Sequence, residues 1–563
     1  MGKHLITSAL PYINGVKHLG NLVGSLLPAD VYARFLRTQG EETLFICATD
    51  EHGTPAELAA REEGLPVSEY CAGMHERQRS IYDSFGISFD HFGRSSSPQN
   101  AGLARHVYET LDANGFIAER TTGQVYSRAD GRFLADRYVV GTCPRCGDRG
   151  ARGDQCEHCG AVLDPVDLIE PRSSLSGSSD LEIRPTKHLY LRADALANDV
   201  DTWINRQEGW PKLTRSIAHK WLDEGLRERC ITRDLDWGIP VPREGYEGKV
   251  FYVWFDAPIE YIGATQEWAD LNPEGRDWRS WWYNADDVTY TQFMAKDNVP
   301  FHTIFWPAAM LGTREPWTLA TQIKSFHWLT YYGDKFSTSA GRGVFLDDAL
   351  DILEPDYWRY FLLAQAPETN DASFTWELLA TVVNKDLVGI FGNFIRRTLT
   401  LADRHFGGQV PPCGEPTQAE RDLGVDVREA LRRYRVSLLR LEYRQAVSEL
   451  RHLWSLGNHY LDTCAPWALV DTDRDAAGRV LHKAINLAYL FAVVASPVIP
   501  FASKTTITAL GMTGRGSEPS WDEAADLNAV PSGHTFRVPE LIFRRITQSD
   551  IDNWKERFEG TIV

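Results

Sequence analysis

Three shortages limit what this chain of 563 residues can be. Positive charge is scarce: 59 lysines and arginines stand against 77 aspartates and glutamates, and the formal net charge of -18 argues against general adhesion to nucleic acid. Any contact with phosphate groups must therefore come from local basic patches. The nine cysteines are too few and too unevenly spread for a disulfide scaffold. No stretch approaches the apolar run of about 20 residues that a membrane helix requires.

The start of the chain also lacks a secretory signal. Residues 1–10 lack the charged region, the apolar region and the small-residue region that follow one another in a secretory signal. They run straight into a strand-like segment. The fractions of 43% hydrophobic and 24% charged residues are those of a globular protein. We therefore expect a cytoplasmic protein without a membrane segment, and at about 150 residues per domain it should hold about three or four structural units.

The first part of the chain has the pattern of a parallel α/β architecture. Residues 5–9 form a short apolar run, and residues 22–37 then show helical spacing that stops at Gly40. Residues 44–48 are a second strand candidate, which ends in a polar cluster that begins at Asp50. Sites in such sheets gather at the carboxyl ends of the strands, so we expect one here.

The pattern changes twice further along. From about residue 115 to 249 the chain becomes Gly-rich, Arg-rich and Cys-containing, as an insertion does when it interrupts a larger domain. Apolar strand character resumes at 250–255 and 301–305, whereas beyond about residue 384 the chain is helical, with one long apolar periodicity over 427–460. We predict an α/β domain split by an insertion and followed by a helical domain. The expected units are residues 1–115, 116–249, 250–325, 326–384 and 385–563.

Four of the cysteines form two close pairs. Cys143 with Cys146 and Cys156 with Cys159 each enclose two residues, which is the spacing of a metal-binding knuckle. Two knuckles can hold one tetrahedral zinc, and four independent buried thiols explain such a pattern in about one case in ten. Four sulfur ligands leave no open position for water. We therefore predict one Zn²⁺ with a structural role.

Two short segments have features of a phosphate site. His18-Leu19-Gly20-Asn21 opens the first predicted helix, where His18 and Asn21 lie at its positive end and Gly20 lets a nucleotide approach the backbone. Lys335 begins a small flexible loop with hydroxyl groups, which is suited to closing over phosphates. Taken singly, an incidental helix start and a solvated turn are the commoner explanations, because short motifs give many false positives.

Together, the two segments resemble the signature motifs of class I aminoacyl-tRNA synthetases. Residues 18–21 resemble the "HIGH" motif and residues 335–339 the "KMSKS" motif. Segments 9–12, 49–54, 252–258 and 301–307 resemble those of methionyl-tRNA synthetases, in that family's order, so the resemblance spans essentially the whole chain. It implies a Rossmann-like nucleotide-binding domain, a zinc-bearing connective insertion over 116–249, a KMSKS-loop and stem-contact region over 326–384, and an α-helical anticodon-binding domain over 385–563.

The resemblance also implies roles for individual residues. The implied catalytic residues are His18, Asn21, Lys335 and Arg233. The implied contacts of ATP, which would carry Mg²⁺, are His18, Gly20, Asn21, Lys296, Asp297 and Lys335. The implied methionine pocket consists of Leu10, Tyr12, Asp50, Trp254, Ala257, Pro258, Tyr261 and His302, with Asp50 as the partner of the substrate ammonium. The implied anticodon contacts are Asn393, Arg397 and Trp467.

Several of these residues have ordinary explanations when the resemblance is set aside. Trp254 and Tyr261 would be core aromatics by roughly four to one. Arg233 is about equally well explained as part of a surface salt bridge. Asp50 would serve as a loop cap, and Trp467, after an Ala-Pro pair, as a core residue at a helix start.

The chain departs from the family at Thr338, where a second lysine is usual. Charge in the transition state should then depend more on Lys335, with Arg342 as a candidate helper. The expected function is ATP-dependent activation of L-methionine and its transfer to the 3′ end of tRNA(Met) by a monomer. Three rivals stay open: a class I synthetase for another apolar amino acid, which normally carries a large editing insertion; a small nucleotidyltransferase; and a degenerate paralogue that only binds tRNA.

Overall fold

The computed structural model describes residues 2–154, 156, 158–159, 161, 163–336, 342–513 and 520–559. Its central feature is a sheet of five parallel strands in the order β14-β13-β1-β2-β3. The strands are β1 (Lys3–Ser8), β2 (Glu42–Thr49), β3 (His91–Arg94), β13 (Val288–Ala295) and β14 (Gln322–Phe326). The strand order reverses between β1 and β13, and open α/β sheets bind ligands at this point, outside the carboxyl ends of the strands.

Both faces of the sheet are buried. Alternate residues of a strand point to opposite faces, so Ile6 and Phe45 pack with α2 (Leu27–Thr38), whereas Leu5 and Ile46 pack with α5 (Pro98–Ala113) and α9 (Glu260–Asp270). Strands covered on both faces are hydrophobic almost throughout, which explains the apolar runs of the sequence. The predicted α/β fold class is confirmed.

The first helical segment follows the sequence prediction closely. α1 (Leu19–Asn21) continues through the π-helical turn η1 (Leu22–Leu26) into α2, which ends beside Gly40, a glycine with a φ of 78°. His18 is the N-cap of α1: its Nδ1 accepts from the Gly20 N–H, and the Asn21 side chain accepts from the His18 N–H. The remaining helices of this part are α3 (Thr54–Glu62) and α4 (Val67–Ser84).

Two predicted strands of the second half are wrong. Within residues 250–255 only β12 (Val250–Phe251) is a strand. It pairs with β11 (Thr232–Arg233) outside the central sheet, and α8 (Val253–Asp256) follows. Residues 301–305 form the π-helix η5 (Phe301–Phe305). The sheet is completed instead by β13 and β14. Short apolar runs are buried in either conformation, so periodicity alone cannot separate strand from helix.

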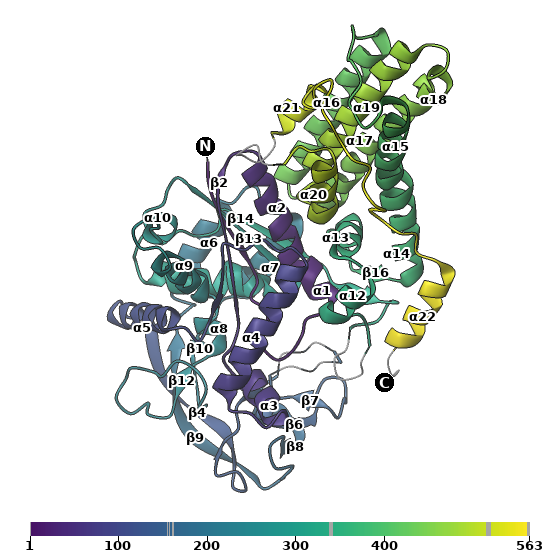
Figure 1. The fold of residues 1–563 in the computed structure, drawn as a ribbon. Helices are drawn as coiled ribbons and strands as arrows, with labels where there is room; N and C mark the ends of the chain where they lie inside the picture. The colour runs from purple at the N-terminus through teal and green to yellow at the C-terminus, as the bar shows by residue number, and fades with distance from the viewer. Residues whose placement is uncertain are drawn as a thin grey trace.

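Besides the β11–β12 pair, the described part of the chain between α5 and β13 contains two antiparallel sheets, which extend to the lower end of the molecule in Figure 1. The larger consists of β4 (Ile117–Ser127), β5 (Arg132–Phe133), β9 (Leu181–Leu191) and β10 (Arg229–Cys230), and the smaller of β6 (Val139–Thr142), β7 (Ala151–Arg152) and β8 (Ile169–Ser173). Besides α8, α9 and η5, the described helical elements between α5 and β14 are η2 (Asp136–Tyr138), η3 (Pro165–Asp167), α6 (Ala197–Asn205), α7 (Lys212–Asp223), α10 (Arg279–Trp282), η4 (Lys296–Asn298) and α11 (Trp306–Gly312).

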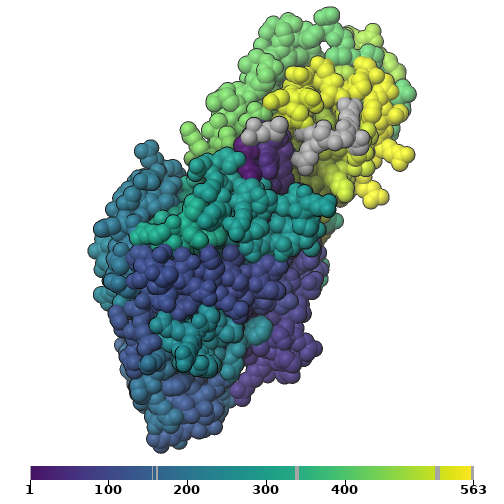
Figure 2. Space-filling model, turned by 90° about the vertical axis from the view of Figure 1, so that its left-hand side faces the viewer, coloured from purple at the N-terminus to yellow at the C-terminus, as the bar shows by residue number. Residues whose placement is uncertain are grey.

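The chain after β14 is mainly helical, as predicted, and its long helices form a separate lobe (Figures 1 and 2). The segment 427–460, for which the sequence suggested one long apolar periodicity, belongs to two helices. The chain turns between them at Leu441, whose φ is 58°. The elements are β15 (Leu329–Tyr331), α12 (Leu346–Ile352), α13 (Pro355–Ala364), β16 (Ala372–Phe374), α14 (Trp376–Val382), η6 (Val383–Gly392), α15 (Asn393–Phe406), α16 (Gln418–Leu439), α17 (Tyr443–Cys464), α18 (Pro466–Leu469), α19 (Arg474–Ala495), α20 (Pro500–Ala509), α21 (Trp521–Ala525) and α22 (Gln548–Phe558).

The last helix, α22, lies apart from this lobe and packs on α14 (Figure 1). The Trp554 and Trp376 rings are 5.0 Å apart, and the Arg557 guanidinium pairs with Asp348 at 2.6 Å. The Gly343 N–H donates to the Phe558 carbonyl at 3.4 Å. The end of the chain therefore supports the segment that follows Lys335.

Among the residues that the structure describes, two helical stretches reach the length and mean hydropathy of a membrane span, which corrects the expectation that no stretch approaches it. One runs from Trp376 to Phe406, and the other is α19, whose apolar window is 94% buried within the protein. A core helix of a folded domain passes the same test, and the burial of α19 has this explanation.

Candidate active site

Asp50 stands at the carboxyl end of β2, beside the loop that follows β1. The Ile13 N–H donates to the Asp50 carbonyl at 2.9 Å, and the Asp50 N–H donates to the Pro11 carbonyl at 3.0 Å. The Asp50 side chain is buried, and its Oδ1 has no hydrogen-bond partner among the residues that the structure describes. Burial, together with the Asp256 and Glu51 carboxylates, raises the pKa of Asp50 well above its usual range. A cationic ligand would satisfy this carboxylate.

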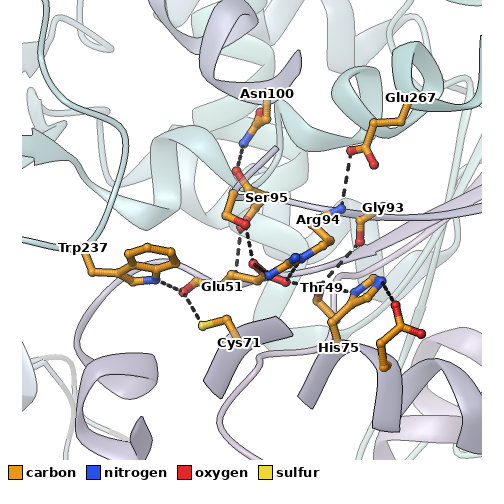
Figure 3. Close-up of polar contacts among 12 residues, drawn as sticks. Thr49, Glu51, Cys71, His75, Gly93, Arg94, Ser95, Asn100, Trp237 and Glu267 are labelled. Atoms are coloured by element: carbon orange, nitrogen blue, oxygen red, sulfur yellow. Dashed lines mark hydrogen bonds and ion pairs between the residues drawn. The ribbon is translucent and has the colours of Figure 1, made fainter. Parts of the chain in front are cut away.

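The next residue, Glu51, fixes the turn that carries Asp50. The buried Glu51 carboxylate accepts from Arg94 Nε at 2.8 Å and from Arg94 Nη2 at 3.0 Å, a bidentate pair. The Trp237 indole N–H donates to the Glu51 carbonyl at 2.6 Å, and the Glu51 N–H donates to Ser95 Oγ at 2.9 Å (Figure 3). Sequence reasoning missed this network, whose members come from distant segments.

The predicted methionine pocket has aromatic walls. The Tyr261 hydroxyl donates to His302 Nε2 at 2.9 Å, while His302 Nδ1–H donates to the Asn298 carbonyl at 3.0 Å. Burial lowers the pKa of His302 to about 4, so the ring is neutral and both of its nitrogens are used. The Trp254 ring lies 4.7 Å from that of Phe301. The π-helical turn η5 thus presents His302 and Phe301 to residues of α8 and α9.

The other pocket residues lie around the same space. The Asp50 charge and the Trp254 indole both act on the Tyr12 hydroxyl, and Tyr12 is 42% exposed. The backbone of Leu10 contacts the Tyr261 hydroxyl. Ala257 and Pro258 follow Trp254 at the end of α8. The structure therefore brings Asp50 together with five of the predicted pocket residues, Leu10, Tyr12, Trp254, Tyr261 and His302.

The two signature segments meet. The His18 ring stacks on Phe336 with centroids 4.4 Å apart and planes 5° apart. The Leu19 N–H donates to the Val344 carbonyl at 3.2 Å, and the Leu346 N–H donates to the Lys17 carbonyl at 2.9 Å. The chain after the second signature therefore pairs with the start of the first helix. Residues 337–341, which include Thr338, lie outside the described residues.

His18 is prepared to donate a hydrogen bond as a neutral ring. Its Nδ1 accepts from the Gly20 N–H at 3.1 Å, so the proton of the neutral imidazole resides on Nε2. Burial and the nearby Lys17 charge lower the pKa of His18 to about 3. A Cβ on residue 20 would lie 2.9 Å from the His18 ring, so only glycine at this position leaves the ring where it is.

The predicted ATP contacts after β13 and β14 converge on Trp328, which the sequence reasoning missed. The ammonium groups of Lys296 and Lys335 lie 4.1 Å and 5.2 Å from the Trp328 ring centroid, and the indole N–H donates to Asp297 Oδ1 at 3.3 Å. Trp328 is 38% exposed and directly follows β14 and His327. The signal for it was its place at the carboxyl end of a strand.

Two arginines are held by ion pairs. Arg233 stacks on the Tyr252 ring at 3.6 Å and pairs with Asp136 at 3.2 Å, which places it at the aromatic wall rather than in a described contact with His18 or Lys335. Arg342 donates to Asp334 at 2.9 Å and to the Glu559 carbonyl at 3.2 Å. Arg342 is therefore engaged with the residue that caps α22.

The four predicted zinc ligands form one cluster. Their Sγ atoms all lie within 4.8 Å of one another, with Cys143 and Cys159 at 3.9 Å and Cys146 and Cys156 at 3.6 Å. Tetrahedral zinc with Zn–S bonds of about 2.3 Å requires sulfur atoms about 3.8 Å apart. The cluster therefore fits a structural zinc ion.

The predicted anticodon residues lie on the helical lobe. Asn393 is exposed at the start of α15, and Arg397 follows one turn later on the same face. The Arg397 guanidinium lies 5.0 Å from the Trp467 ring centroid and pairs with Asp462 at 2.9 Å. Trp467 is 44% exposed, so it is not a core residue.

The fold and the site together define the class as a class I aminoacyl-tRNA synthetase. The family model "tRNA synthetases class I (M)" matches residues 4–399, and the model "Anticodon binding domain of methionyl tRNA ligase" matches residues 410–562. The chain belongs to the methionyl-tRNA synthetase family.

Individual relatives agree with this assignment. The chain is 56% identical to the methionine–tRNA ligase of Streptomyces avermitilis over the whole of both chains. It is 53% identical to methionine–tRNA ligase 1 of Acaryochloris marina, over 99% of this chain and all of that one. The fold resembles that of Mycobacterium tuberculosis methionyl-tRNA synthetase in complex with methionyl-adenylate, with a TM-score of 0.78, 23% identity, and coverage of 97% of this chain and 100% of the other.

Proposed function

We propose that this enzyme activates L-methionine with ATP to methionyl-adenylate and transfers the methionyl group to the 3′ end of tRNA(Met). The observation that carries the proposal is the contact between the two signature segments, where His18 stacks on Phe336 at 4.4 Å. Asp50 lies beside the loop that leads from β1 to His18, since its backbone is hydrogen-bonded to Pro11 and Ile13. Phosphate-binding groups and an ammonium-binding group thus share one end of the sheet.

In the proposed reaction the methionine carboxylate attacks the α-phosphate of ATP, and pyrophosphate leaves. A terminal hydroxyl of the tRNA, by class I analogy the 2′-OH, then takes the acyl group and AMP leaves. His18 Nε2–H, Asn21 and Lys335 stabilise charge on the phosphates, and no protein nucleophile is needed. Mg²⁺ bound to ATP would neutralise further phosphate charge.

Substrate choice would come from the pocket walls. The side chain of methionine is unbranched and carries only a weakly polar thioether, which suits the apolar aromatic surface of Trp254, Tyr261 and Phe301. The neutral His302 contributes no charge, since its pKa is lowered by burial. Asp50 would bind the substrate ammonium.

ATP–pyrophosphate exchange, run separately with each amino acid, tests the function. We expect exchange with methionine alone. Exchange with another apolar amino acid would identify a different synthetase, and no exchange with any amino acid would identify a protein that only binds tRNA.

We propose that the chain divides functionally at the expected boundaries, into residues 1–115 and 250–325 for catalysis, 116–249 for the insertion, 326–384 for the loop region and 385–563 for the anticodon. Arg233 would approach the substrate carboxylate or phosphate only after its pair with Asp136 loosens. The enzyme would act as a cytoplasmic monomer outside any membrane.

We predict one zinc ion per chain, bound by Cys143, Cys146, Cys156 and Cys159, because their sulfur atoms have tetrahedral spacing. Metal analysis of the purified protein by mass spectrometry measures it. Cys146→Ser should lose the zinc, whereas Cys413→Ser, outside the cluster, should keep it. Finding no zinc or two zinc ions per chain would contradict the prediction.

Replacing Trp467 by alanine should weaken aminoacylation of the tRNA by about 1–3 kcal/mol, the usual worth of one base–aromatic stack. Phenylalanine or tyrosine at this position should restore part of the loss. ATP–pyrophosphate exchange should stay unchanged, since it needs no tRNA. The melting temperature should also hold, because the ring is 44% exposed. A parallel fall of both activities and of the melting temperature would make Trp467 structural.

A further inference from the structure

Lys17 directly precedes His18 and lies in the loop that connects β1 to α1. Its ammonium group donates to Asn14 Oδ1 at 3.0 Å. The same loop is bound to Asp50 through the Ile13 N–H, at 2.9 Å, and the Lys17 carbonyl accepts from Leu346, just after the second signature. Lys17 is thus held where both signature segments and the Asp50 turn meet.

The Lys17 charge acts on both predicted substrate groups, His18 and Asp50. Burial is the main cause of the lowered pKa of His18, and the Lys17 charge lowers this pKa further. The same charge opposes the rise in the pKa of Asp50. In the proposed function His18 contacts phosphate and Asp50 contacts the amino group of methionine. The methionine carboxylate lies one carbon from that amino group, so it and the α-phosphate must meet between these two side chains.

A cation at this place would add to the charge of Lys335. Thr338, in the second signature segment, carries no charge. The candidate helper Arg342 is engaged by Asp334 at 2.9 Å and by the carbonyl of Glu559 at 3.2 Å. Attack of one anion on another develops charge that oriented cations stabilise strongly in a site shielded from water.

We propose that Lys17 is a further catalytic residue of this enzyme, whose ammonium group binds the methionine carboxylate and the α-phosphate oxygens as the bond between them forms. The inference rests on the proposed function. Lys17 transfers no proton and forms no covalent bond. Asn14 is its positioning residue, because it holds the ammonium within the loop.

The first test compares Lys17→Met, which keeps most of the side-chain length without the charge, with Lys17→Arg and with the wild-type enzyme. The matched control is Lys504→Met, on the exposed side of α20. We expect Lys17→Met to slow single-turnover adenylate formation by about 100-fold, as the loss of one group that stabilises transition-state charge does. Methionine binding at equilibrium and the melting temperature should change little, Lys17→Arg should retain much of the rate, and Lys504→Met should match the wild type.

The second test is the pH profile of the single-turnover rate with saturating substrates. Burial lowers the pKa of Lys17 to about 8, although the Asp50 carboxylate opposes the shift. Lysine is active when protonated, so the wild-type rate should fall as the pH rises through this range. The charged and titratable groups around Lys17 are Asp50 at the end of β2, His18 on α1, and Asp347 on α12, which pairs with Arg77. His18, whose pKa is lowered to about 3, loses its proton far below this range and cannot produce this fall.

In Lys17→Met the fall near pH 8 should be absent, and in Lys17→Arg it should move to higher pH. A merely structural lysine would change the melting temperature and leave the shape of the profile unaltered. An unchanged rate with tighter methionine binding would make Lys17 only a counter-ion of Asp50, and this result overturns the proposal. A wild-type enzyme that exchanges with no amino acid refutes the proposed function itself, whereas an active wild type with an equally active Lys17→Met refutes Lys17 alone.

Discussion

Lys335→Ala should reduce ATP–pyrophosphate exchange by at least about two orders of magnitude and leave methionine binding nearly intact, since a cation on the reacting phosphates acts mainly in the transition state. Lys335 directly precedes Phe336, whose ring stacks on His18, and its ammonium lies 5.2 Å from the Trp328 ring centroid. Arg342 is tied to Asp334 and cannot readily replace it. The measurement is the exchange rate at saturating ATP and methionine, with methionine affinity from equilibrium dialysis.

The control for this prediction is Lys187→Ala, an exposed lysine on β9 that pairs with Glu119. It should keep both activities. Near-normal exchange in Lys335→Ala would remove the second signature segment from the active site.

Asp50→Asn should raise the KM for methionine by about 100-fold, because removing one partner of a buried charge pair costs about 2–5 kcal/mol. The asparagine keeps the size of the side chain, and the Glu51–Arg94 pair still holds the turn. The pKa of Asp50 is raised in the folded protein, so above the pKa of the unfolded chain its ionisation opposes folding. The melting temperature at neutral pH should therefore stay the same or rise.

Steady-state exchange at varied methionine concentration, together with calorimetry, checks both parts of this prediction. Asp83→Asn, an exposed position on α4, is the matched control. A lower melting temperature with an unchanged KM would instead make Asp50 the cap of its loop.

Much of the architecture could be predicted from the sequence, because its signals are local. The strand before Asp50, the helix that opens at His18 and the cysteine knuckles depend on short patterns and on burial, and the structure agrees with each. The family assignment is confirmed by models that match residues 4–399 and 410–562. The assigned roles of individual residues stay predictions.

The rest depends on contacts between segments far apart in the sequence. Residues 301–305 were predicted as a strand, yet they form a π-helix that turns His302 toward Tyr261. Nothing near Trp328 in the sequence indicates that Lys296 and Lys335 lie over its ring. Likewise, only the folded chain shows that Arg94 holds the Glu51 carboxylate.

The position of α22 means that the enzyme cannot be divided by a single cut into an independent catalytic piece and an RNA-binding piece. A chain shortened after α15 would lose the Trp554 ring from Trp376 and the Arg557 partner of Asp348, although every residue of the candidate active site would remain. The segment from Gly343 to Asp348, which pairs with the start of the first helix, would then be held from one side only. Damage to α22 should accordingly appear as a defect in amino-acid activation. Mutations in this helix can therefore change the rate of catalysis although they lie far from the reacting atoms.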